Sequence, residues 1–127
     1  MVRKLMLAAT AGLCLGAGAL AADRAEDAVV SDPDSHVVVF ENEHVRVIEN
    51  FSGFGKSSSP THSHNSMVLV SLDKARLKMT VPGEAPFILD LRPGQVLWLE
   101  NAEHSWEILA GQLHVVAVEV KSAAKAN

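Results

Sequence analysis

The sequence predicts an all-β domain whose antiparallel strands form a sandwich or barrel. Short apolar runs, about ten residues apart, are separated by turns that contain Pro and Gly, which is typical of such folds. Beyond the first 22 residues, no segment repeats apolar residues at the i, i+3, i+4, i+7 positions of an amphipathic helix. The pattern therefore favours strands throughout the body of the chain.

Length and charge limit the classes of protein to consider. The chain has 127 residues, of which 48% are hydrophobic and 20% charged, the balance of one globular domain. Its formal net charge is −4, and its 11 Lys and Arg residues form no basic stripe. We therefore expect no nucleic-acid partner.

The N-terminal region has the three parts of a secretory signal peptide. Arg3 and Lys4 precede a short apolar run, which ends in the small residues Ala21 and Ala22 before an acidic segment. We expect cleavage near Ala21-Ala22 and a periplasmic or secreted protein. The alternative is a membrane anchor, but the run of 16 residues is shorter than the ~20 that span a bilayer. No stable membrane anchor is therefore expected after processing, which would also remove Cys14, the only cysteine.

The composition divides the chain into four parts. We expect a signal peptide over residues 1–22, a flexible acidic lead-in over 23–36, a β-barrel domain over 37–121 and a frayed tail over 122–127. Everything functional is then expected in the third part.

Apolar periodicity predicts the individual strands. Segment 45–51 places Val45, Val47 and Phe51 on one side, and 67–72 is almost continuously apolar, as in a strand buried on both faces. The remaining predicted strands are separated by turns at Pro and Gly and cover 37–40, 75–81, 86–91, 95–99, 105–110 and 112–121. In 75–81 the apolar side chains alternate with Arg and Lys, which indicates one buried face.

A His-x-His pair is the most informative motif. His62 and His64 follow a loop rich in Gly and Ser, and in an extended chain residues two apart point to the same face, about 6–7 Å apart at Cα. Imidazoles so placed can bind one Fe, Ni, Cu or Zn ion. The alternative is two surface histidines on a loop. If the chain stays extended and its side chains keep alternating, Val68 points to the same face as His62 and His64. This would place the pair at the mouth of an apolar cavity.

A third histidine, His104, follows after a Pro-Gly turn and the strand that contains Trp98. With it, the arrangement resembles the cupin superfamily, in particular small single-domain exported cupins with an RmlC-like barrel. Gly55 and the segment 60–64 match the start of the first cupin motif, and the segment 93–98 with His104 matches the frame of the second.

The resemblance implies a jelly-roll antiparallel β-barrel in which His62, His64 and His104 bind one divalent metal ion. The metal would be Fe, Mn, Ni, Cu or Zn, and pairing of two barrels would give a homodimer. The chain departs from the pattern at Val68, where the family usually has a glutamate ligand. Two readings stay open: a metal site retained with three histidines, and a metal site that is lost.

Other residues have weaker indications. His114 alternates with three valines and is expected to face inward, as a core residue or as support for a ligand. His36 and His44 are expected at the surface. Residues considered for a pocket or for support of the metal ligands are Val68, Trp98, Trp106 and His114.

Two function classes follow. The first is a metal-dependent enzyme that acts on a small-molecule ligand, as a dioxygenase with iron or as an isomerase or lyase with another metal. The second is a non-catalytic barrel that binds a small molecule or the metal itself. A general base beside the ion would favour the first, and Glu100, Glu103 and Glu107 are the acids near His104. Glu100 and Glu103 lie in a bend and are expected in solvent. A barrel that serves mainly as a dimer scaffold is a third, simpler reading.

Overall fold

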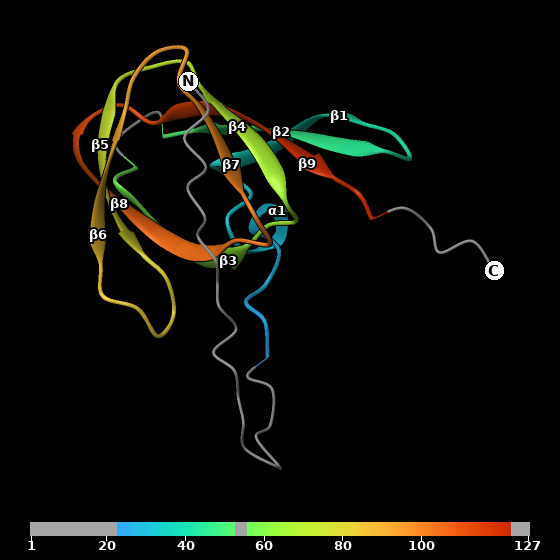
Figure 1. Cartoon of the computed structure of the whole chain (residues 1–127), viewed down its shortest axis with the longest axis horizontal. Helices are drawn as coiled ribbons and strands as arrows, with labels where there is room; N and C mark the ends of the chain where they lie inside the picture. The colour runs from blue at the N-terminus through green and yellow to red at the C-terminus, as the bar shows by residue number, and fades with distance from the viewer. Residues whose placement is uncertain (1–22, 53–55, 123–127) are drawn as a thin grey trace.

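The computed structural model describes residues 23–52 and 56–122. In this part the chain forms two antiparallel β-sheets that enclose a common core (Figure 1). One sheet has the strand order β1-β2-β9-β4-β7, and the other has the order β3-β8-β5-β6. The predicted all-β, jelly-roll architecture is confirmed. The signal peptide predicted over residues 1–22 lies outside the described residues.

The described elements comprise one short helix and nine strands. Their bounds are α1 (Ala28–Ser31), β1 (His36–Glu41), β2 (Val45–Phe51), β3 (Ser58–Ser63), β4 (Met67–Ser71), β5 (Ala75–Thr80), β6 (Phe87–Leu91), β7 (Val96–Leu99), β8 (Glu103–Gly111) and β9 (His114–Val120).

Strand β3 was not among the predicted strands, because its sequence contains serines, a proline and a histidine rather than apolar residues. It is held in the second sheet by antiparallel pairing with β8, with an irregularity between Ser59 and His62. Its strand conformation therefore depends on a partner more than 40 residues away, which local periodicity does not reveal.

The core lies between the inner faces of the two sheets. Strand β5 matches its prediction, since Ala75, Leu77 and Met79 are buried and the charged residues between them are exposed. They pack with leucines of β6 and β7 and with Trp106 of β8. The turn before β9 requires glycine, because Gly111 has φ +73° and an added Cβ would lie 2.2 Å from the carbonyl oxygen of Lys74.

The predicted inner face of the first sheet is wrong for two strands, β4 and β9. In β2, for which no inner face was predicted, the buried side chains are Ile48 and Asn50, on the side opposite to Val45, Val47 and Phe51. In β4 the barrel interior is lined by Met67 and Leu69 rather than Val68, and in β9 by Val115 and Ala117 rather than by the face of His114. The reason is that both faces of this sheet carry valines and other apolar residues, so alternation does not show which face is inside.

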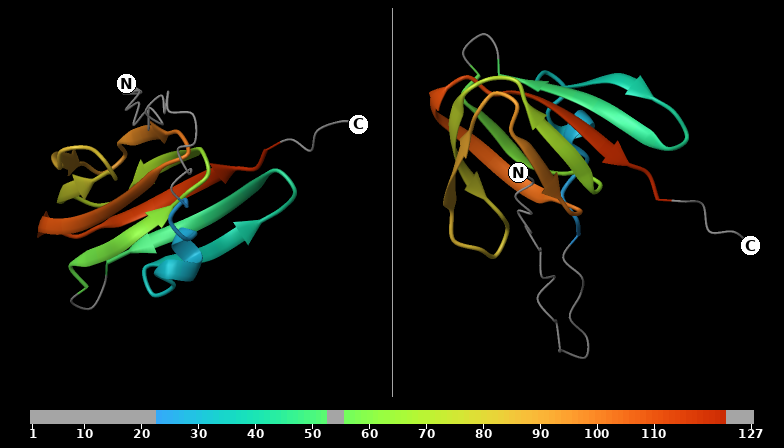
Figure 2. Two further views of the ribbon diagram at one scale, coloured as in Figure 1. Left: turned by 90° about the horizontal axis from the view of Figure 1, so that it is seen from below. Right: turned by 45° about the horizontal axis from the view of Figure 1, so that its top comes forward.

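The segment before β1, predicted as a flexible lead-in, packs against β1 and β3 in the structure (Figure 2). Asp27 forms an isolated parallel bridge with Ser63 and caps α1 by accepting a hydrogen bond from the backbone N–H of Val29. Ala28 is fully buried. None of the helices in the described residues is long and apolar enough to span a membrane.

Candidate metal centre

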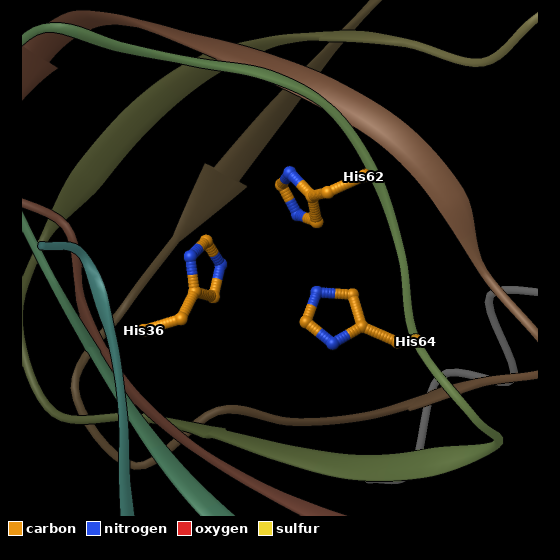
Figure 3. Close-up of side chains that lie close together, drawn as sticks. All are labelled: His36, His62 and His64. Atoms are coloured by element: carbon orange, nitrogen blue, oxygen red, sulfur yellow. The ribbon is translucent and has the colours of Figure 1, made fainter. Parts of the chain in front are cut away.

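Three buried histidines lie close together (Figure 3). His36 is the first residue of β1, His62 lies in β3, and His64 follows two residues later. One ring nitrogen of each lies within 4.8 Å of those of the other two. The side chains are buried, with 1%, 0% and 3% of each residue exposed in that order. We call these three residues the histidine cluster.

Hydrogen bonds behind the rings fix their orientation. Nδ1 of His36 lies 3.1 Å from the carbonyl oxygen of Asp32, and Nδ1 of His62 lies 2.8 Å from that of Pro60. Nδ1 of His64 lies 3.0 Å from the carboxylate oxygen Oε2 of Glu119. Because each partner is an acceptor, each neutral ring carries its proton on Nδ1 and its lone pair on Nε2. Figure 3 shows one nitrogen of each ring turned toward the other two rings.

The lone pairs differ in their surroundings. Nε2 of His36 lies 3.0 Å from the side-chain amide nitrogen of Asn50, which donates to it. Nε2 of His62 is buried and has no hydrogen-bond partner among the described residues. An acceptor that is buried without a partner is unusual in a protein interior, and it is the state expected of a ligand atom that faces an ion site.

Burial keeps the rings neutral. It lowers the pKa of His36 to about 4, with a further contribution from His62. It also lowers the pKa of His62, and it holds that of His64 well below its usual range together with the neighbouring imidazoles. At pH 7 the rings are therefore in the neutral form that coordinates metals.

Behind His64 lies a buried ion pair. Glu119 is completely buried, and its Oε1 accepts a hydrogen bond from Nε of Arg46 at 2.8 Å and lies 2.6 Å from Nη2 in the same ion pair. Arg46 also donates to Asp27, at 2.7 Å. Burial raises the pKa of Glu119, and the hydrogen bond from Arg46 opposes this rise. A carboxylate that holds the Nδ1 proton of a histidine is the usual second partner of a metal-binding imidazole.

A second buried carboxylate supports the other two rings. Asp32 accepts hydrogen bonds from Lys56 and, at 2.5 Å, from Ser59, whose hydroxyl also lies 3.2 Å from Nδ1 of His62. Burial raises the pKa of Asp32, but the hydrogen bonds from Lys56 and Ser59 outweigh it and the pKa is lowered. Asp32 is therefore ionised at neutral pH, beside His36, whose Nδ1 lies 3.6 Å away.

His104, a predicted ligand, lies against the cluster. It is the register partner of His62 across β3 and β8, and its ring centroid is 4.8 Å from that of His62 and 5.3 Å from that of His64. Burial, with the neighbouring imidazoles, holds its pKa well below the usual range. Its Nδ1 is buried without a hydrogen-bond partner among the described residues. The three histidines whose ligand atoms lie within 4.8 Å of one another are His36, His62 and His64, so this group contains His36 in place of His104.

His36 is the candidate metal ligand that sequence reasoning missed. It was expected in solvent, as the end of an acidic segment, yet it is buried in the cluster. Its place follows from the register of β1 and β2, which sets it opposite Asn50, a residue on the inner face. In the sequence, His36 is only a histidine just before a run of valines. Whether its side chain points inward depends on the register of β1 against β2, which the sequence does not show.

An apolar cavity of about 40 Å³ adjoins the cluster. His36, His64 and His104 line it together with core leucines and methionines. Trp106, which was expected either in a pocket or in support of the metal ligands, also lines the cavity. Val68, Trp98 and His114 do not line it, in contrast to their prediction as pocket or supporting residues.

The reason for this difference is the inverted parity of the first sheet. Val68 pairs with Trp98 and with Val118 on its outer face. His114 forms an ion pair with Glu49, with 2.7 Å between Nε2 and Oε1, and stacks edge-on against Phe51. The glutamates near His104 do not line the cavity either: Glu100 and Glu107 are exposed, and Glu103 accepts a hydrogen bond from the backbone N–H of Ala25.

Comparison with known proteins identifies the fold. No protein-family model matches the chain, and no curated protein matches it significantly. Among solved structures, a cupin domain from Bordetella pertussis Tohama I is 22% identical and has a TM-score of 0.61, with 80% of this chain and 99% of that one covered. An RmlC-like cupin family protein with a double-stranded β-helix fold, from Methanocaldococcus jannaschii, is 21% identical with a TM-score of 0.51, covering 70% and 83%.

A cupin protein from Bacteroides fragilis is 18% identical with a TM-score of 0.50, covering 84% of this chain and 86% of that one. The chain therefore has the cupin fold, and the resemblance predicted from the sequence is confirmed at the level of fold. On this fold it carries three buried histidines close enough together to hold a metal ion.

Proposed function

We propose that the protein binds one divalent transition-metal ion through His36, His62 and His64. The observation that carries this proposal is the orientation of the three rings. Each Nδ1 is engaged by an acceptor behind the ring, so that the three Nε2 atoms face one another in a buried space. Nε2 of His62 has no partner among the described residues, and Nε2 of His36 would exchange its hydrogen bond from Asn50 for the ion. His104, whose Nδ1 is buried without a partner beside them, is the candidate for a fourth ligand.

The donor set favours certain metals. Imidazole suits Fe, Ni, Cu and Zn, whereas Mg, Ca and Mn prefer carboxylates and other oxygen ligands. Glu119 is the carboxylate nearest to His64, and both of its oxygens are already engaged, by Arg46 and by His64. A nitrogen-rich site therefore favours Fe, Ni, Cu or Zn over Mn.

A metal-dependent oxygenase is the second candidate, favoured by the apolar cavity beside the ligands. With iron bound, such a site would supply activation of dioxygen, and the cavity would keep water away from it. No carboxylate is among the described residues that line the cavity, so no acidic side chain there would act as a general base. The part of the chain in such a reaction would then be to bind the substrate and orient it. The proposal of metal binding does not depend on turnover.

The first test is metal content by mass spectrometry, on protein purified without a His-tag. The wild type is compared with a His36→Ala/His62→Ala/His64→Ala variant and with His44→Ala, a control whose side chain is 76% exposed. Near-stoichiometric metal in the wild type and control, lost in the triple variant, supports the proposal. A metal-free wild type that also takes up no added Fe, Ni, Cu or Zn would overturn it.

Export and homodimerisation remain predictions from the sequence. We propose a periplasmic or secreted location, supported by the arrangement of Arg3, Lys4 and the apolar run before Ala21-Ala22. Cell fractionation with mass measurement of the processed chain tests this. A full-length chain in the cytoplasm would contradict it.

A further inference from the structure

The barrel cavity beside the histidine cluster has the size of a very small ligand. Its volume is about 40 Å³, where a single water needs roughly 10–15 Å³ on the same measure. It is bounded by apolar side chains from both sheets, among them Met67 of β4 and Met79 of β5. A molecule of about three or four non-hydrogen atoms is therefore the largest that enters without displacing the core.

The charge of the lining restricts the chemistry of the ligand. The described lining residues include no Asp, Glu, Lys or Arg. A carboxylate or phosphate in this space would lose its hydration without gaining a counter-charge from a side chain, which is strongly unfavourable. Neutral molecules carry no such penalty.

Three buried polar atoms of lining residues have no hydrogen-bond partner among the described residues. They are Nε1 of Trp106, Oδ1 of Asn50 and Nδ1 of His104. The indole N–H can only donate and the amide oxygen can only accept. Buried polar groups are nearly always paired, so the N–H of Trp106, a donor without a partner, indicates an acceptor beside it. Nδ1 of His104 is already the candidate fourth metal ligand, and Oδ1 of Asn50 would be completed only by a ligand that also carries a donor such as a hydroxyl.

We propose that the cavity binds a small neutral oxygen compound, such as a ketone, aldehyde or alcohol, whose oxygen accepts a hydrogen bond from Trp106. The carbon atoms of the ligand pack against the leucines and methionines of the core. Its role as a substrate rests on the proposed function, because the cavity adjoins the metal ligands His36 and His64. Its binding rests on the cavity alone.

The test compares two probes of nearly equal shape, neutral acetone and anionic acetate. Each is titrated into the ¹⁵N-labelled protein at pH 7, in metal-free and in zinc-loaded form, while the indole N–H signals are followed by NMR. The chain has two tryptophans, and Trp98 lies outside the cavity, so its signal is an internal control. A Trp98→Phe variant assigns the signal of Trp106.

We expect acetone to shift the Trp106 signal in a saturable manner without moving that of Trp98, and acetate to leave the metal-free protein unchanged. Two variants add a second readout, in which ¹³C-methyl signals of Met67 and Met79 report occupancy. Trp106→Phe removes the N–H donor and should weaken acetone binding about tenfold, as expected for one lost hydrogen bond. Ala117→Leu fills part of the cavity and should abolish binding.

Three results would overturn the proposal: no response of Trp106 to acetone, an equal response to acetate in the metal-free protein, or undiminished acetone binding by a folded Ala117→Leu variant. Metal content is measured on the same samples. A metal-free protein that responds to acetone but takes up no metal would refute the proposed function while supporting this one. The reverse combination would retain the metal site and refute the ligand class.

Discussion

Glu119→Gln removes one buried charge while keeping the shape of the side chain. The carboxylate of Glu119 is fully buried and joins Nδ1 of His64, at 3.0 Å, to the guanidinium of Arg46. Breaking a buried ion pair costs about 3–5 kcal/mol when one charge is left behind. Arg46 keeps its bond to Asp27 and is partly exposed, so we expect a loss near the lower end, about 3 kcal/mol.

The same substitution should weaken metal binding. The carboxylate holds the proton of His64 on Nδ1 and so directs the lone pair of Nε2 into the cluster. Loss of such a partner typically reduces metal affinity about 10- to 100-fold. The affinity is measured by competition with a chromophoric chelator, and the free energy of unfolding by urea denaturation of the metal-free protein.

Glu49→Gln is the matched control, because Glu49 also forms an ion pair with a histidine, His114, with 2.7 Å between Nε2 and Oε1. This second pair lies on the outer face of the sheet, and the side chain of Glu49 is 43% exposed. Exposed pairs contribute about 0–1 kcal/mol, and this one touches no proposed ligand. If Glu119→Gln and Glu49→Gln bind metal equally tightly, the proposed support of His64 is refuted.

Three further predictions concern stability. The metal-free protein should lose stability as the pH falls from 6.5 toward 4, because the lowered pKa of His36, about 4, lets the unfolded chain bind a proton that the folded one does not. This histidine alone contributes about 3 kcal/mol over that range, and urea midpoints that stay constant from pH 7 to 4.5 would contradict it. Leu97→Ala, in the core, should cost about 2–5 kcal/mol, whereas Val37→Ala, at a site 52% exposed, should change stability by less than about 0.5 kcal/mol, as measured by urea denaturation. Gly111→Ala should destabilise the protein more than Gly83→Ala. Both glycines have positive φ (+73° and +79°), but only at Gly111 would the added Cβ meet a backbone carbonyl, that of Lys74. Equal thermal midpoints of the two variants would argue against this close approach.

Several features of the fold were predictable because they are local. Turns at Pro and Gly separate the strands, and the clean alternation of apolar and charged residues in β5 showed its buried face. The His-x-His spacing brought His62 and His64 together, as the structure confirms. These signals depend on neighbours in the chain, so they needed no knowledge of partner strands.

The inner face of the first sheet was not predictable in the same way. Strand β4 has apolar residues on both faces, and Val68 and Leu69 are equally good candidates for the interior. Because side chains alternate strictly, an error of one residue inverts the whole strand. Pairing with β7 and β9 decides the question, and the sequence of β4 alone cannot.

The sequence by itself determined the strand-rich architecture, the resemblance to cupins and the pair His62 and His64. The tertiary structure alone decided that His36 joins them, and that Glu119 lies behind His64 from a strand 55 residues further along the chain. Both placements depend on strand register between distant segments. The candidate metal site, assembled from β1, β3 and β9, is therefore a property of how the sheets pair, since no single segment of the sequence contains it.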